Sequence, residues 1–155
     1  MRRTLIVLAV VALGLSAGAL LAEGAVLIPS WRLLQPESFL ALYGQHAALL
    51  VWFFGPLEVV AAVSVTLAAL LGWFAGERST GVLAVAALLA VLVLLAFPLY
   101  FQRANASFAE GTIAITEVQD ELQRYSNWHW VRVVVAVTAF VLAVLAARGH
   151  DARTA

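Results

Sequence analysis

The chain contains no cysteine and no lysine, and it carries little charge of either sign. Nine arginines and nine acidic residues make up 12% of its 155 residues and balance to a net charge of zero. The absence of cysteine excludes disulfides, thiolate nucleophiles and cysteine-ligated metals. Zero net charge gives no reason to expect nucleic acid as a partner. Soluble domains carry about 25% charged residues, so an ordinary soluble domain is excluded as well.

Apolar residues are as abundant as charged residues are scarce. They make up 64% of the sequence, and the mean hydropathy is +0.98. Soluble domains are roughly 45–50% apolar. This composition predicts an integral membrane protein in contact with the lipid bilayer. The length suits one compact unit, so we expect a single membrane domain over residues 1–155.

Four stretches are long and apolar enough to cross a bilayer, whose core of ~30 Å needs roughly 20 residues of helix. They cover about residues 4–29, 48–74, 81–102 and 127–147. The first also resembles a bacterial secretory signal peptide with a cleavage-like Ala17-Gly18-Ala19. Because its apolar run continues to Ile28, we expect a retained helix. The fold class predicted is all-α, a four-transmembrane-helix antiparallel bundle.

Two further segments, about 30–47 and 103–126, carry most of the remaining sequence. The first has a helix-start signal at Pro36. The second places apolar residues at i, i+4 and i+7 among acidic ones (Val118, Leu122 and Tyr125). This spacing is typical of an amphipathic helix. We therefore expect short amphipathic helices on the outer face of the bundle.

The placement of the arginines predicts the orientation. With the N-terminus inside, the inner segments hold five of them (Arg2, Arg3, Arg78, Arg148 and Arg153), and the outer segments hold three (Arg32, Arg103 and Arg124). This bias predicts a multi-pass protein of the bacterial cytoplasmic (inner) membrane with cytoplasmic N- and C-termini.

Charged residues inside the apolar stretches are the strongest functional signal. They are Glu23, Glu58 and Arg132, and His129 lies one turn before Arg132. A charge at mid-bilayer costs ~2.5–3.5 kcal/mol on insertion scales. Counted along each helix from its outer end, Glu23 lies about 9 Å deep, Glu58 about 13 Å, Arg132 about 7 Å and His129 about 3 Å. This shared depth predicts one polar pocket, open toward the outer face and closed below by apolar residues.

The chemistry expected of this pocket is proton transfer. Two neighbouring carboxylates in an apolar site cannot both stay charged cheaply unless Arg132 or a metal compensates, and general acid–base catalysis needs such groups. The candidate catalytic residues are Glu58, Glu23, His129 and Arg132. Glu23, Glu58 and His129 are also candidate ligands for a metal ion, although the chain has no Glu-x-x-His pair. The cofactor stays open, with haem or a metal ion among the alternatives.

Five further residues are candidates for substrate binding near the pocket mouth: Asn105, Tyr100, Tyr125, His46 and Trp128. A pocket reached from the membrane predicts a lipophilic ligand, planar or chain-like. His46 precedes Glu58 by twelve residues, or ~18 Å of helix, so it joins the site only if the helix breaks near Gly55-Pro56. A structural reading also stands, in which a Glu–Arg pair only holds helices together.

Several short motifs resemble the anthrone-oxygenase-like family of small four-helix membrane proteins. They are "GALLAEGAVLIPSW", "FFGPLEV", "FPLYFQRANASF" and "YSNWHWVR". Within them, the family's pattern corresponds to Pro98, Asn105, Tyr125, His129 and Arg132, with Tyr125 where the family more often has Trp. The resemblance implies an oxidoreductase or oxygenase acting on a lipophilic aromatic or quinone-like substrate.

The sequence thus leaves three functional hypotheses. In the first, Glu58 or Glu23 removes a proton from such a substrate, and Arg132 and His129 stabilise the resulting enolate or phenolate. In the second, the pocket is a non-enzymatic binder or carrier of a lipid, quinone, haem or metal ion. In the third, the chain is a structural membrane subunit. The Ala-rich helix faces would also allow a homo-oligomer.

Overall fold

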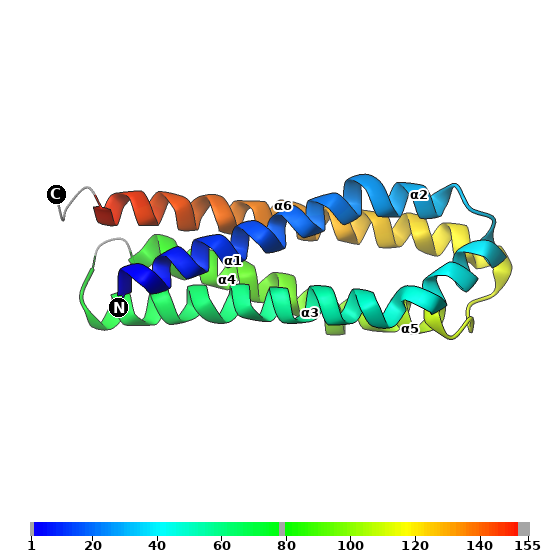
Figure 1. Ribbon diagram of the computed structural model, residues 1–155, viewed down its shortest axis with the longest axis horizontal. Coiled ribbons are helices and arrows are strands. Elements are labelled where there is room, and N and C mark those ends of the chain that lie inside the picture. Colours follow the sequence, from blue (N-terminus) through cyan, green and yellow to red (C-terminus); the bar gives the residue numbers. More distant parts are fainter. Residues whose placement is uncertain (1, 78–79, 152–155) are drawn as a thin grey trace.

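The computed structural model of the chain describes residues 2–77 and 80–151, and this part contains helices and no strands (Figure 1). Four of its helical stretches are long and apolar enough to cross a membrane: Arg3–Arg32, Pro36–Phe74, Thr80–Ala109 and Ile115–Gly149. The all-α four-helix bundle expected from the sequence is therefore confirmed, and the chain is a multi-pass membrane protein.

The first span consists of α1 (Arg2–Ala22), a π-helical turn η1 (Glu23–Leu27) and α2 (Ile28–Arg32). The second is the single helix α3 (Pro36–Phe74). The third joins α4 (Thr80–Ala96), a second π-helical turn η2 (Phe97–Phe101) and α5 (Gln102–Ala109). The fourth follows a 3₁₀ turn η3 (Ile115–Glu117) as the single helix α6 (Val118–Asp151).

The four spans form a square in which each helix packs against two antiparallel neighbours. Contacts join α1 to α3, α3 to α4, α4 to α6, and α6 back to α1. Helix α1 begins and helix α6 ends near the end of α3 and the start of α4, and the connections from α2 to α3 and from α5 to α6 lie at the opposite end of the bundle (Figure 1). We call that opposite end, and the half of the bundle next to it, distal.

Two helices are longer than the sequence suggested. Helix α3 starts at Pro36 instead of residue 48, and α6 starts at Val118 instead of residue 127. The expected amphipathic segments are thus largely continuous with the spans. In α6 the reason is phase: Val118 and Tyr125 lie on the same stripe as His129 and Arg132, and all four are buried. One straight helix buries both sets of side chains, so no bend is needed.

The core changes in character along the bundle. Near the termini it is built mostly from alanines, among them Ala9, Ala61, Ala86, Ala139 and Ala143. Small side chains let helix backbones approach closely. In the distal half it is an aromatic cluster that includes Trp31, Phe39, Tyr43, Phe101, Phe108 and Tyr125. Each of these rings fills far more of the space between helices than an alanine does.

The two π-helical turns were not predicted. Their defining bonds run from the Ile28 N–H to the Glu23 carbonyl and from the Gln102 N–H to the Phe97 carbonyl, five residues apart. Proline inside η2 contributes to the irregularity, because Pro98 cannot donate a helix hydrogen bond and its ring crowds the preceding turn. Turns of this kind are rare and lie mostly at functional sites.

Two of the five arginines expected on the inner side, Arg78 and Arg153, lie outside the described residues.

Candidate functional site

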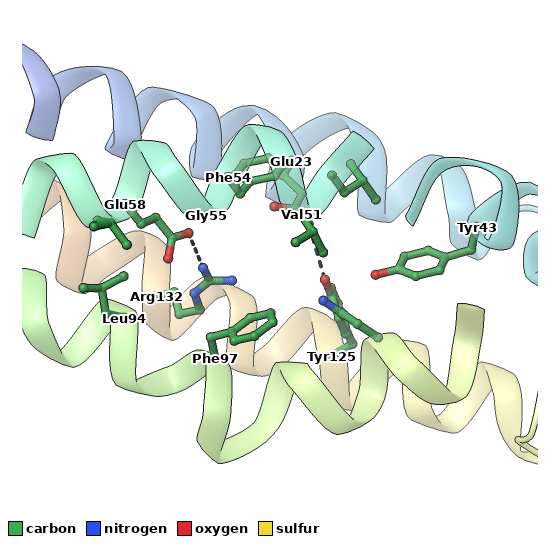
Figure 2. Close-up of a pocket in the computed structure, with 13 residues that line it drawn as sticks. Glu23, Tyr43, Val51, Phe54, Gly55, Glu58, Leu94, Phe97, Tyr125 and Arg132 are labelled. Atoms are coloured by element: carbon green, nitrogen blue, oxygen red, sulfur yellow. Dashed lines mark hydrogen bonds and ion pairs between the residues drawn. The ribbon is translucent and has the colours of Figure 1, made fainter. Parts of the chain in front are cut away.

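A cavity of about 230 Å³ lies in the distal half of the bundle. Six polar side chains from η1, α3, α5 and α6 line it: Glu23, Tyr43, Glu58, Asn105, Tyr125 and Arg132. The apolar part of the lining includes Leu50, Phe54, Leu94 and Phe97. Figure 2 shows the carboxylates and the guanidinium at one part of this space and Tyr43 approaching from another. Three of the four residues predicted from their depth, Glu23, Glu58 and Arg132, therefore line one cavity, whereas His129 does not line it and lies beside Glu23.

Arg132 forms an ion pair with Glu58 that joins α6 to α3. The Nη2 atom of Arg132 donates to Oε1 of Glu58, and the two side chains are only 8% and 5% exposed. The guanidinium carbon also lies 4.4 Å from the centre of the Phe101 ring, within the range of a cation–π interaction. The single arginine of the pocket is thus already neutralised by a carboxylate.

Glu23 lies beside a second pair of residues from α6. The Tyr125 hydroxyl donates to Oε1 of Glu23 at 3.4 Å, and Nδ1 of His129 lies 3.9 Å from Oε2. The other ring nitrogen of His129, Nε2, is 2.8 Å from the Leu20 carbonyl oxygen. A carbonyl oxygen can only accept, so Nε2 carries the hydrogen. His129 is 0% exposed and stacks on the Tyr125 ring.

Gly24 makes room for this histidine. A Cβ atom added at Gly24 would lie 3.0 Å from Cδ2 and 3.4 Å from Nε2 of His129. Gly24 belongs to the π-helical turn η1, directly after Glu23. The local sequence Glu23-Gly24 therefore supplies both the carboxylate and the space in which the imidazole reaches α1.

Asn105 brings an unused hydrogen-bond acceptor to the cavity. Its Oδ1 atom is buried and has no hydrogen-bond partner. Buried polar atoms are nearly always paired in folded proteins. Asn105 lines the cavity from α5, and Tyr43 points its hydroxyl into the same region from α3 (Figure 2). A bound molecule with a donor group would satisfy Asn105.

The cavity opens to the side of the bundle. The lining residues Val51, Gly55 and Val59 follow one face of α3 at i, i+4 and i+8, and the two valines are 50% and 48% exposed. Phe97 of η2 is also exposed. The distal end, in contrast, is filled by the aromatic cluster. The exposed lining residues thus face the lipid side of the bundle, and the opening toward the outer face stays a prediction.

Three predicted substrate-binding residues do not line the cavity. His46 is exposed, and its Nδ1 donates to the Leu42 carbonyl of its own helix at 2.9 Å. Because α3 continues through Gly55-Pro56 without a break, His46 stays far from Glu58. Tyr100 donates to Glu121 at 2.7 Å and stacks on the half-exposed Trp128. Neither ring lines the cavity.

The candidate metal ligands do not assemble into a metal site. Within residues 2–77 and 80–151, no three His, Cys, Asp or Glu side chains gather closely enough to hold a metal ion. Glu58 is taken by Arg132, while Glu23 faces His129 and Tyr125. The donor groups are therefore divided between two separate contacts.

Sequence reasoning missed Tyr43 as a site residue. It is buried in the same cluster as Phe39, so nothing in its spacing separates it from an ordinary core residue. It precedes Glu58 by fifteen residues, or about 22 Å of helix, a span that only an elongated cavity can bridge. The apolar lining residues Phe54 and Phe97 carry no signal that separates them from lipid-facing residues.

Comparisons with protein-family models, with curated proteins and with solved structures find no match for this chain.

Proposed function

We propose that the chain is a small membrane oxidoreductase of the oxygenase-like type that acts on a lipophilic aromatic or quinone-like molecule. The observation that carries the proposal is a laterally open cavity with apolar walls, two carboxylates and one arginine. At about 230 Å³ it is smaller than the ~300–1,000 Å³ typical of drug-sized ligand sites. It suits a small ring system, and any longer apolar part of the molecule would lie in the bilayer.

The reaction would begin with proton removal. Glu58 or Glu23 takes a proton from an acidic C–H or O–H group of the substrate, and the electron pair stays behind as an enolate or phenolate. Arg132, which lines the cavity, would stabilise that anion directly, and His129 would act on it through Glu23, beside which it is buried. The anion would then give its electron pair to dioxygen, the co-substrate of an oxygenase, and form a carbon–oxygen bond to a peroxide. The carboxylic acid would return its proton to the peroxide, and loss of water would leave the carbonyl group of the oxidised product. The resemblance to the anthrone-oxygenase-like family supports this choice of reaction.

The proposed setting is the bacterial cytoplasmic membrane, with both termini in the cytoplasm. The arginine bias and the signal-peptide-like start of the sequence support it. A homo-oligomer stays a prediction, because many of the alanines that suggested close packing face the interior of this bundle.

The test uses the full chain in lipid nanodiscs with a panel of anthrones, hydroxyanthraquinones and naphthoquinols. Turnover is followed by the absorption of the oxidised product, and binding by titration. Glu23→Gln and Arg132→Ala should each lower turnover by about 100-fold or more, the usual range for losing an acid–base group. His46→Ala is the matched control, since that exposed residue is outside the cavity. Normal turnover by folded Glu23→Gln and Arg132→Ala proteins would refute the reaction.

A non-enzymatic binder or carrier is the second candidate, favoured by the lateral opening alone. It would bind the same panel and convert none of it. The absorption spectrum, metal content and lipid extract of the detergent-purified protein distinguish the two. A stoichiometric quinone, lipid or haem together with zero turnover would favour the carrier.

A further inference from the structure

The buried groups of the cavity can be sorted by charge. Arg132 is cationic and its partner Glu58 is anionic, so this pair is neutral. The remaining titratable groups facing Glu23 are His129, Tyr125 and Tyr43, which are all buried. A net charge on these remaining groups would be strongly unfavourable in such an apolar setting. Glu23 and His129 must therefore be neutral as a pair, and this requires one proton for the two of them.

The hydrogen bonds show where this proton belongs. Because Nε2 of His129 donates to the Leu20 carbonyl, that nitrogen keeps its hydrogen. Its Nδ1 atom is buried without a hydrogen-bond partner and faces Oε2 of Glu23 across 3.9 Å. A bare Nδ1 is an acceptor and a carboxylate oxygen is an acceptor. Two facing acceptors in a buried site need a donor between them, and one proton on either atom supplies it.

We infer that Glu23 and His129 hold one exchangeable proton between them, and that this pair is the proton donor and acceptor of the cavity. Glu23 lines the cavity and would exchange the proton with a ligand. His129 is a positioning residue, since it is fully buried and acts through Glu23. Glu58 has a different role, because Arg132 keeps it anionic. The assignment to a reaction rests on the proposed function, whereas the presence of the proton does not.

The inference can be tested on ligand-free protein. Infrared spectra in nanodiscs at neutral pH report the C=O stretch of a protonated carboxylic acid, and NMR of isotope-labelled histidine reports the hydrogens on both ring nitrogens. We expect either a carboxylic acid band that Glu23→Gln abolishes or an imidazole of His129 protonated on both nitrogens. A His129→Phe variant identifies the histidine signal. Spectra showing a Glu23 carboxylate beside an unprotonated Nδ1 would overturn the inference.

Charge balance gives a sharper second measurement. In Glu58→Gln the arginine loses its counterion, so Glu23 should release the proton and become anionic. In the double variant Arg132→Met/Glu58→Gln neither charge remains, so the pair should keep its proton. A signal that stays unchanged in Glu58→Gln would contradict the charge argument. These spectra need no substrate: the proton with no turnover on any compound would refute the proposed function alone, and turnover without the proton would refute the inference alone.

Discussion

Arg132 and Glu58 connect α6 to α3 by an ion pair buried inside the bundle. Removing one member of such a pair leaves the other as an uncompensated buried charge. Arg132→Met should therefore lower the free energy of unfolding by about 3 kcal/mol, the lower end for broken buried pairs. The double variant Arg132→Met/Glu58→Gln should recover most of this loss. Thermal unfolding in detergent, followed by circular dichroism, measures both; a double variant as unstable as the single one would contradict the expectation.

Gly24 and Gly18 form a matched pair on the first span. An added methyl at Gly24 would come within 3.0 Å of His129, whereas one at Gly18 meets nothing within 4 Å. Gly24→Ala should destabilise the protein by about 1 kcal/mol or more through overpacking. Gly18→Ala should be neutral or stabilising by up to about 1 kcal/mol, because alanine is the better helix former. Equal melting temperatures for the two variants would show that His129 does not need the space at Gly24.

Gly55 allows the mouth of the cavity to be closed without disturbing the core. It lines the cavity, and a Cβ atom there meets no atom within 4 Å. Gly55→Leu should fill the lateral opening and weaken the binding of a hydroxyanthraquinone at least tenfold, with an unchanged melting temperature. Binding is measured by titration in nanodiscs. Gly18→Leu, also in open space but outside the cavity lining, should bind normally. Normal binding by Gly55→Leu would exclude lateral entry.

Asn105 should affect stability and binding in opposite directions. Its Oδ1 atom is buried without a partner in the empty cavity, so Asn105→Leu removes an unsatisfied acceptor and should leave stability equal or higher. A hydroxylated ligand would lose a hydrogen bond worth about 1–2 kcal/mol, roughly a tenfold drop in affinity. Asn127→Leu is the control, because Asn127 lies on the exposed surface and accepts from Gln123. Parallel changes in stability and affinity would argue against ligand contact.

The fold was predictable because the spacing and length of the apolar runs determine it. Long uncharged runs require helices in a bilayer, and four of them with short connections give an antiparallel bundle. The length of α6 was available too, in the shared phase of Val118, Tyr125, His129 and Arg132. It was missed because a bilayer sets a minimum length for a span and no maximum.

The candidate site was predictable only in part. Helical rise gave the depths of Glu23, Glu58 and Arg132, and these three side chains line one cavity. Depth alone does not give direction around a helix axis. Tyr100 was therefore placed in the mouth, although it turns to Glu121 instead. The lateral opening depends on which apolar residues face lipid and which line the cavity. A valine or a phenylalanine can occupy either kind of position, so the sequence does not distinguish them.

The π-helical turns also decide where the chain can change in length. A regular helix rotates about 100° per residue, whereas a turn closed by a bond between residues i and i+5 fits one extra residue into about one turn, so the following helix keeps nearly the phase it would have without that residue. Deleting one residue within Phe97–Phe101 should therefore restore a regular helix and leave Asn105 at the cavity and Phe108 in the aromatic cluster. Deleting one residue from the regular part of α4 would instead rotate α5 by about 100° and remove both side chains from these places. The third span should thus tolerate a single-residue deletion in η2 more readily than one in α4.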